Sequence, residues 1–216
     1  ILRRRQGLIS MGQDPVAGFC DTNAVMKRDM RMTLYSDTFR RNLQGYEAVE
    51  VLRGYAAAAP TDDPLSLVQY LDLKTYLPGD ILTKVDRASM AHSIEVRVPL
   101  LDHKLVEWAS SLPTAFKRRG EEGKYILKRA MEPYLPQDIL YRPKRGFAVP
   151  LAQWFRGPLR DRLHNALASE ALMDSGVFDR ARLNRLFAEH ERGIRDLSSP
   201  LWSVMMFEAF LQSETG

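Results

Sequence analysis

The sequence predicts a mainly α-helical fold, and three observations support this. Apolar residues recur at spacings of three and four over most of the chain. Serine and aspartate stand where several of these patterns begin, as helix N-caps do. No strand–helix–strand alternation of the kind that builds a parallel sheet occurs. With 216 residues, 45% of them hydrophobic and 27% charged, the chain has the composition of a globular protein with a core.

The first 33 residues differ from the rest because their periodicity is weak and glycine and proline interrupt it. We therefore expect residues 1–33 to be a connecting segment with one short helix around 23–30, and residues 34–216 to form the helical portion.

Helices are expected, in order, over residues 36–45, 46–54, 63–77 and 80–92. Ser36 is predicted to cap the first of them. Asp63 is followed by a proline, which suits an N-cap with proline at the first helical position. Pro78 and Gly79 are expected to separate the last two helices.

In the second half, helices are expected over residues 103–112, 124–134, 151–155, 159–169, 180–192 and 200–212. Asp102 is predicted to cap the first. Three prolines frame residues 135–150, which are expected to be irregular. The last helix is apolar nearly all round, so we expect it to be buried.

One segment, Ile94-Glu-Val-Arg-Val-Pro-Leu-Leu-Asp102, alternates charged and β-branched residues. A short strand and a buried extended segment both fit this pattern. In either, Glu95 and Arg97 point to the same side because they are two residues apart. The two side chains are expected either to form a structural ion pair or to frame a polar site.

A second polar segment, Tyr141-Arg-Pro-Lys-Arg-Gly-Phe147, places three cations within four positions. It fits either a solvent-exposed loop or a loop that meets an anion. The whole chain has a net charge of +4 and a pI near 9.2, which fits a solvated basic surface or a site for polyanions such as ATP.

The single cysteine, Cys20, excludes an intrachain disulfide and fits a reducing compartment. We expect it to be a small packing residue and not a nucleophile. No apolar run reaches bilayer-spanning length, and the first residues are too polar for a signal peptide. Because the sequence begins with Ile1, we expect a truncated start.

Residues 82–102 closely resemble the hallmark segment of asparagine synthetase C-terminal domains. Further segments match in the same order: Gly123–Lys128, Leu135-Pro136, Arg142–Phe147, Trp154–Leu159 and Leu201–Glu208. The last two are similar to the bacterial amidotransferase branch found near exopolysaccharide and exosortase genes. The resemblance covers about residues 35–211.

The resemblance implies the helical C-terminal portion of an adenine-nucleotide α-hydrolase-like (PP-loop ATP pyrophosphatase) α/β synthetase domain, whose parallel sheet lies mostly upstream. Family members adenylate a carboxylate, usually aspartate, with ATP and transfer glutamine-derived ammonia to it, giving AMP and pyrophosphate. The implied partners are a glutaminase domain and an N-terminal nucleotide-binding half of the same polypeptide. A cytoplasmic location follows, and a homodimer is left open.

The resemblance also assigns roles to residues. Glu95 matches the family glutamate that acts as a base near the acyl carbon. Lys144 matches the loop lysine that stabilises charge on pyrophosphate. Substrate or nucleotide contacts are expected from Lys84, Asp86, Arg87, Arg97, Lys124, Arg145 and Gly146. Asp102 is assigned an orienting, structural role.

The nucleotide loop Ser-Gly-Gly-x-Asp-Ser and the acidic segment Gly-x-Gly-x-Asp-Glu do not occur in the sequence. The main ligands of ATP and Mg²⁺ are therefore expected upstream of residue 1, and no metal ligand is predicted in this chain. We interpret the chain as a fragment of the synthetase domain that forms no amide by itself.

Two alternatives belong to other classes. Residues 3–5, 117–119 and 144–145 would form the basic patch of a helical module that binds RNA or an acidic protein. These clusters are short and no nucleic-acid motif accompanies them, so neither nucleic acid nor a membrane is expected as a partner. The second alternative is a synthetase-like scaffold without catalysis, against which the presence of both Glu95 and Lys144 argues.

Overall fold

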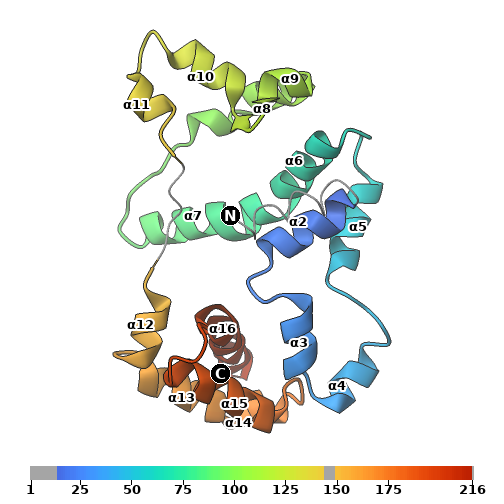
Figure 1. Ribbon diagram of the computed structural model, residues 1–216, viewed down its shortest axis with the longest axis vertical. Coiled ribbons are helices and arrows are strands. Elements are labelled where there is room, and N and C mark those ends of the chain that lie inside the picture. Colours follow the sequence, from blue (N-terminus) through green and yellow to red (C-terminus); the bar gives the residue numbers. More distant parts are fainter. Residues whose placement is uncertain (1–13, 144–148, 216) are drawn as a thin grey trace. The chain divides into compact units, whose positions relative to one another are not determined.

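A computed structural model of the chain describes residues 14–143 and 149–215. Helices dominate it, as Figure 1 shows. Within the described residues, the one sheet has two strands, β1 (Arg118–Arg119) and β2 (Glu122–Gly123), which pair antiparallel. The prediction of a mainly α-helical fold is confirmed.

The helices of the first half are α2 (Pro15–Asn23), α3 (Arg28–Leu34), α4 (Asp37–Asn42), α5 (Val49–Ala57), α6 (Pro64–Lys74), the π-helix η1 (Leu77–Leu82), α7 (Thr83–Met90), the 3-10 turn η2 (Pro99–Leu101) and α8 (His103–Ser111). Those of the second half are α9 (Thr114–Lys117), α10 (Tyr125–Met131), α11 (Gln137–Leu140), α12 (Leu151–Arg156), α13 (Arg160–Ala168), α14 (Glu170–Asp174), α15 (Arg180–Glu191) and α16 (Ser198–Thr215).

The chain divides into two compact units. The first unit comprises residues Ile1–Phe19 and Val51–Phe147, and the second comprises Cys20–Glu50 and Ala148–Gly216.

The second unit has a continuous hydrophobic core. Its buried members are Leu34, Phe155, Leu163, Ala166, Leu167, Leu172, Leu183, Leu186, Phe187, Leu197, Leu201, Val204 and Met205. On α13, α15 and α16 they recur every three or four residues, which places them on one face of each helix. Helix α16 packs against α12, α13, α14 and α15. The sequence therefore builds this core from amphipathic helices.

Backbone hydrogen bonds connect two segments of the second unit that are distant in sequence. The Asp179 N–H donates to the Leu34 carbonyl at 2.9 Å, and the Ser36 N–H donates to the Val177 carbonyl at 2.9 Å. The Arg182 guanidinium donates to the Tyr35 carbonyl at 2.7 Å and pairs with Asp37 at 3.1 Å. Residues 34–37 are thereby joined to the start of α15.

The first unit buries much less apolar surface. Among its described residues the buried hydrophobic side chains are Val16, Phe19 and Leu71. Many large apolar side chains of its helices are exposed, including Trp108 of α8 and Phe116 of α9.

The three predicted N-caps are confirmed. The Ser36 hydroxyl accepts from the Phe39 N–H at 3.0 Å, and Asp63 accepts from the Ser66 N–H at 2.9 Å. Asp102 accepts from the Leu105 N–H at 3.1 Å at the start of α8. Each oxygen satisfies a donor that the first helical turn would leave open.

The predicted break at Pro78 and Gly79 is wrong. The chain continues there as the π-helix η1, which leads directly into α7. Pro78 stands in the first turn of η1, where a missing N–H costs no helical hydrogen bond. The Gly79 N–H donates to the Thr75 carbonyl at 2.9 Å, and the Thr83 hydroxyl donates to the Pro78 carbonyl at 2.7 Å. These bonds carry the helical path across the predicted break.

Other boundaries also differ. The helix expected around residues 23–30 is wrong, because α2 ends at Asn23 and α3 begins at Arg28. The segment 135–150 is not wholly irregular, since it contains α11. The last helix is buried along one face and not all round: Leu201 and Val204 are inaccessible, whereas Phe210 is exposed.

The segment 94–102 is neither a strand nor buried. Residues 94–98 have no regular structure, and Ile94, Val96 and Val98 are exposed. The β-branched alternation that suggested a strand has no partner strand among the described residues. Ala88 of α7 and Ala91, which directly follows the helix, are exposed as well.

Among the described residues, no helix combines the length and the apolarity that crossing a membrane requires.

Candidate active site

The strongest candidate is the pair formed by Glu95 and Arg97. Arg97 Nε donates to Glu95 Oε1 at 2.8 Å, and Arg97 Nη2 donates to Glu95 Oε2 at 3.4 Å. Spacing by two residues thus brings both side chains to one side, as the sequence predicted. The Glu95 side chain is 71% exposed and that of Arg97 is 82% exposed. A buried structural ion pair is therefore excluded for these two residues in this structure.

The segment that carries this pair lies between the end of α7 and the start of α8. Ser93 has a φ of 55°, in the left-handed region, directly after α7. The Ile94 N–H donates back to the Ser89 carbonyl at 3.0 Å and closes the end of α7. The chain then runs through Glu95 and Arg97 to η2, where Asp102 caps α8. Two capped helix ends hold the short segment that carries the pair.

Helix α7 supplies the next group of predicted residues. Lys84 Nζ lies 3.5 Å from the Asp80 carboxylate, and both side chains are largely exposed. Lys84 and Arg87 are three residues apart, so they share one helix face, whereas Asp86 does not face Lys84. This face offers two cations to an anionic ligand.

Tyr76 and Asp80 lie next to this face, and neither was predicted from the sequence. Tyr76, Asp80 and Lys84 follow one another at intervals of four, a spacing that could have revealed them. Partial burial and a hydrogen bond with Asp80 raise the pKa of the Tyr76 phenol. Burial also raises the pKa of the nearby Asp72 carboxyl.

The remaining predicted residues are scattered. Lys124 is exposed and adopts a left-handed conformation, with φ 59° and ψ 33°, at the N-cap position of α10. Asp102 accepts from the Leu105 N–H at the start of α8, and its assigned orienting role in the site stays a prediction. Lys144, Arg145 and Gly146 lie outside the described residues, so their predicted roles stay predictions. The structure brings together Glu95 with Arg97, and Lys84 with Arg87 on one helix face.

A polar network precedes the Lys144 segment in the chain. The Tyr141 hydroxyl donates to Glu132 Oε1 at 2.6 Å, and Arg129 pairs with the same oxygen at 2.8 Å. The hydrogen bond to Glu132 raises the pKa of the Tyr141 phenol. Lys128 lies over the Tyr141 ring at 5.1 Å from its centroid and pairs with Glu122 at 3.0 Å. These contacts fix Tyr141, the residue three before Lys144.

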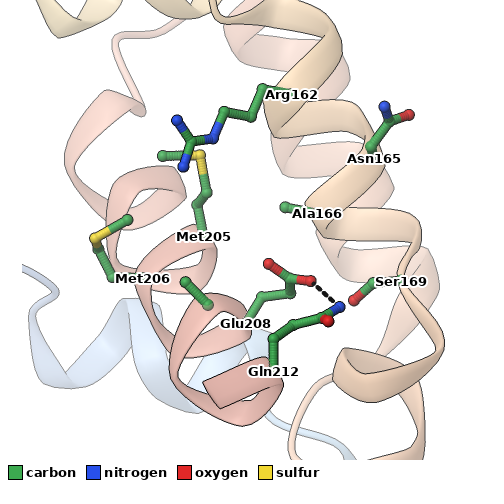
Figure 2. Close-up of a pocket in the computed structure, with 9 residues that line it drawn as sticks. Arg162, Asn165, Ala166, Ser169, Met205, Met206, Glu208 and Gln212 are labelled. Carbon is green, nitrogen blue, oxygen red and sulfur yellow. Dashed lines mark hydrogen bonds between the residues drawn. The ribbon is translucent and has the colours of Figure 1, made fainter. Parts of the chain in front are cut away.

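The second unit has a surface hollow. Its volume is about 530 Å³, and it is lined by α13 and α16 residues, among them Arg162, Met205 and Glu208, as Figure 2 shows. Glu208 accepts from Gln212 at 2.9 Å, a side-chain pair one helical turn apart. None of the predicted functional residues that the structure describes lines this hollow.

Cys20 is unpaired and half-buried in α2. Burial raises the pKa of its thiol, which favours the poorly nucleophilic protonated form. This agrees with the packing role predicted for it.

Comparison with known proteins decides the family. The asparagine synthase family model matches residues 7–212. The chain belongs to the asparagine synthase family. Its synthetase domain has the adenine-nucleotide α-hydrolase-like fold, and the helices described above are part of such a domain.

Curated relatives agree with this membership. A Mycobacterium tuberculosis protein that bears the name of a glutamine-hydrolysing asparagine synthetase is 41% identical over 67% of this chain and 22% of its own length. Asparagine synthetase 1 of Bacillus subtilis is 32% identical over 73% of this chain and 25% of its own length. Amidase chyE of Penicillium rubens is 31% identical over 54% of this chain and 18% of its own length. No solved structure matches the chain.

The chain therefore spans between about a fifth and a quarter of the length of the first relatives it matches. Members of the asparagine synthase family use ATP. Within the described residues, no group of three or more His, Cys, Asp or Glu side chains is placed to hold a metal ion. The cations of α7 suit the oxygens of a phosphate group.

Proposed function

We propose that this chain supplies the base-carrying half of the active site of an ATP-dependent amide ligase. The complete enzyme would convert a carboxylate and ATP into an acyl-adenylate and pyrophosphate, and then convert the acyl-adenylate and ammonia into an amide and AMP. The observation that supports this most is the exposed Glu95–Arg97 pair in a chain of the asparagine synthase family.

Glu95 would act in the second step. When ammonia forms a bond to the acyl carbon, its nitrogen becomes positively charged and must lose a proton. A carboxylate offers about four lone-pair positions, so the two bonds from Arg97 leave acceptor capacity on Glu95. Glu95 can therefore take the proton while Arg97 keeps its position fixed.

Lys144 would act in the first step, because charge builds up on the phosphate oxygens as pyrophosphate leaves. Lys84 and Arg87 would meet the same anionic ligand from one face of α7, with weaker contributions from Lys124, Arg145 and Gly146. Mg²⁺, when bound, would neutralise phosphate charge, and its ligands would come mainly from residues beyond this chain. We assign Asp86 to the substrate pocket.

Aspartate is the proposed carboxylate and glutamine-derived ammonia the proposed nitrogen source. The amidase among the relatives shows that names in this family extend beyond asparagine synthetases, so another carboxylate stays open. A glutaminase domain and a nucleotide-binding half of the same polypeptide are the proposed partners. The reaction would take place in the cytoplasm.

The test uses two proteins. The first is the 216-residue chain alone, which is expected to form no amide from aspartate, ATP and ammonium chloride. The second is a single polypeptide in which residues 14–212 replace the corresponding part of the synthetase domain of the M. tuberculosis relative. There, Lys144→Ala should lower pyrophosphate release on the order of 100-fold and leave glutamine hydrolysis unchanged.

The controls separate a catalytic from a structural role for Lys144. Lys117→Ala changes another lysine of the first unit and should leave both activities within about twofold. Equal loss of pyrophosphate release and glutamine hydrolysis in Lys144→Ala would refute the assignment. Amide formation by the isolated chain would refute the proposal that it carries only part of the site.

A further inference from the structure

The surface hollow of the second unit has an apolar lining as well as charged groups. The apolar side chains that line it are Ala166 of α13 and Met205, Met206 and Ala209 of α16. Its volume of about 530 Å³ lies within the range of sites that bind small organic molecules. Such sites combine a mainly apolar wall with a few polar groups that orient the ligand.

Two opposite charges line this hollow, Arg162 from α13 and Glu208 from α16. Figure 2 shows the Arg162 side chain reaching toward Met205, with Glu208 further along α16. Among the residues that the structure describes, the Arg162 side chain has no hydrogen-bond or ion-pair partner, and the Glu208 side chain accepts from Gln212 at 2.9 Å. The cation and the carboxylate therefore share one hollow without pairing with each other.

Both charged groups can still bind a ligand. A carboxylate offers about four lone-pair positions, so the bond from Gln212 leaves acceptor capacity on Glu208. The planar Arg162 guanidinium keeps all its donors, and its geometry suits a carboxylate. A single ligand that satisfies both groups must carry a negative and a positive charge.

The two methionines set a further requirement for the ligand. Met205 is buried, whereas Met206 is 37% exposed. Covering this surface with an apolar group would remove it from water, which is favourable in proportion to the area. Thioethers adapt to different apolar shapes and make favourable contacts with aromatic rings. The ligand should therefore also carry a large apolar group.

We infer that the hollow binds a free α-amino acid with a large apolar side chain. Its carboxylate would contact Arg162, its ammonium group would contact Glu208, and its side chain would cover Met205 and Met206. In an α-amino acid these three groups leave one carbon atom, so one small molecule can reach all three kinds of lining. The inference goes beyond the proposed function, because none of these residues takes part in the ligase chemistry proposed above.

The experiment follows the methionine methyl signals of the 216-residue chain by NMR. Met205→Leu and Met206→Leu assign the two signals of the hollow, and Met90, which is exposed in the first unit, is the control. Four compounds are titrated separately. L-Phenylalanine has all three groups, 3-phenylpropionate lacks the ammonium group, phenethylamine lacks the carboxylate, and L-aspartate lacks the apolar side chain.

L-Phenylalanine should shift the signals of Met205 and Met206 until they saturate, and should leave Met90 unchanged. Each of the other three compounds should bind at least about 10-fold more weakly, because each lacks one of the three contacts. Because the ligand binds α13 and α16 together, saturating L-phenylalanine should also raise the unfolding temperature of the chain.

Variants test the two charges separately. Arg162→Gln and Glu208→Gln each remove one charge and keep a polar side chain, and each should weaken L-phenylalanine binding at least about 10-fold. Arg162→Gln should also weaken 3-phenylpropionate, whereas Glu208→Gln should not. Arg185→Gln is the control, because Arg185 is exposed on α15 and does not line the hollow. It should bind L-phenylalanine as the natural chain does.

Several results would overturn the inference. The first is the absence of a saturating shift at Met205 and Met206, and the second is a shift of the same size at Met90, which means non-specific contact. Equal affinities for L-phenylalanine and 3-phenylpropionate would mean a site for apolar anions, and equal affinities for L-phenylalanine and phenethylamine a site for apolar cations. If a variant does not fold, the four compounds still decide with the natural chain.

Discussion

Arg97 contacts both oxygens of the Glu95 carboxylate, with Nε–Oε1 at 2.8 Å and Nη2–Oε2 at 3.4 Å. A planar guanidinium fixes the orientation of a carboxylate in a way that a single ammonium cannot. Because the pair is exposed, it adds little to stability. We therefore propose that Arg97 is a positioning residue, which sets the direction in which Glu95 points.

Replacing Arg97 with lysine should separate the effect of its charge from its effect on the orientation of Glu95. Arg97→Lys keeps the charge but loses the two-point contact, so amide formation should fall about 10-fold or more as Glu95 leaves its working position. Pyrophosphate release should change much less, and thermal stability should stay the same. Arg28→Lys, in the exposed Arg28–Glu47 pair, is the control. An equal loss of both activities in Arg97→Lys would contradict a positioning role.

The Asp102 cap gives a prediction about stability alone. Asp102→Ala leaves the Leu105 N–H at the start of α8 without its partner. This should lower the free energy of unfolding by about 1 kcal/mol, and Asp102→Asn should restore most of it. Trp108 lies in α8. In a protein that carries both Trp154→Phe and Trp202→Phe, urea unfolding followed by tryptophan fluorescence therefore reports the unfolding of α8. A loss in the asparagine variant as large as in the alanine variant would contradict the cap.

His190 predicts a pH dependence of stability in the second unit. Its ring is inaccessible, Nδ1 accepts from the Leu197 N–H at 3.1 Å, and Nε2 has no partner that meets hydrogen-bond geometry. Burial, and then the charge of Arg156, lower the pKa of His190 below its ordinary value, against the opposing effects of Asp196 and the Ala152 backbone. The neutral ring is therefore the folded form.

The lowered pKa of His190 determines the direction in which the free energy of unfolding changes with pH. The stability contributed by neutral His190 is complete above about pH 6.5, the unfolded value, and is lost as the pH falls below it. Urea unfolding at pH 7.5 and at pH 5.5 should show this loss in the natural protein. His190→Gln keeps an acceptor for Leu197 without titrating, so its stability should change less between the two pH values. An equal loss in both proteins would exclude His190 as the cause.

The contrast between the two units gives a prediction with a matched pair of substitutions. Phe155 is fully buried in the second unit, and Phe116 is 48% exposed in the first. Phe155→Ala should cost about 3–5 kcal/mol of unfolding free energy, and Phe116→Ala about 0.5 kcal/mol or less in the isolated chain. Calorimetry measures both. Similar costs would mean that the apolar residues of the first unit are already covered.

Much of the helical fold follows from local chemistry. Ser36, Asp63 and Asp102 were predicted as caps because their short oxygens reach an open N–H of the first turn, and all three do so. The pairing of Glu95 with Arg97 was also predictable, since a spacing of two sets side chains on one side of an extended segment. These features depend on neighbours in sequence.

The sequence predictions that were wrong concern features that depend on other parts of the molecule. The alternation at residues 94–98 is the pattern of a strand, but a strand requires a partner, and none of the described residues provides one. Pro78 and Gly79 are typical of a break, yet hydrogen bonds from Gly79 and Thr83 carry a π-helix across it. The predicted functions of Lys144, Arg145 and Gly146 lie outside the described residues and stay predictions.

The most direct test of the proposed function is the ratio of amide formed to pyrophosphate released by Glu95→Gln. The measurement uses the polypeptide that joins residues 14–212 to the rest of the M. tuberculosis relative, with ammonium chloride as the nitrogen source. If Glu95 is the base of the second step, pyrophosphate is still released while amide formation falls on the order of 100-fold, so the ratio collapses. An unchanged ratio, with both products made at the normal rate or both lost together, would contradict the account.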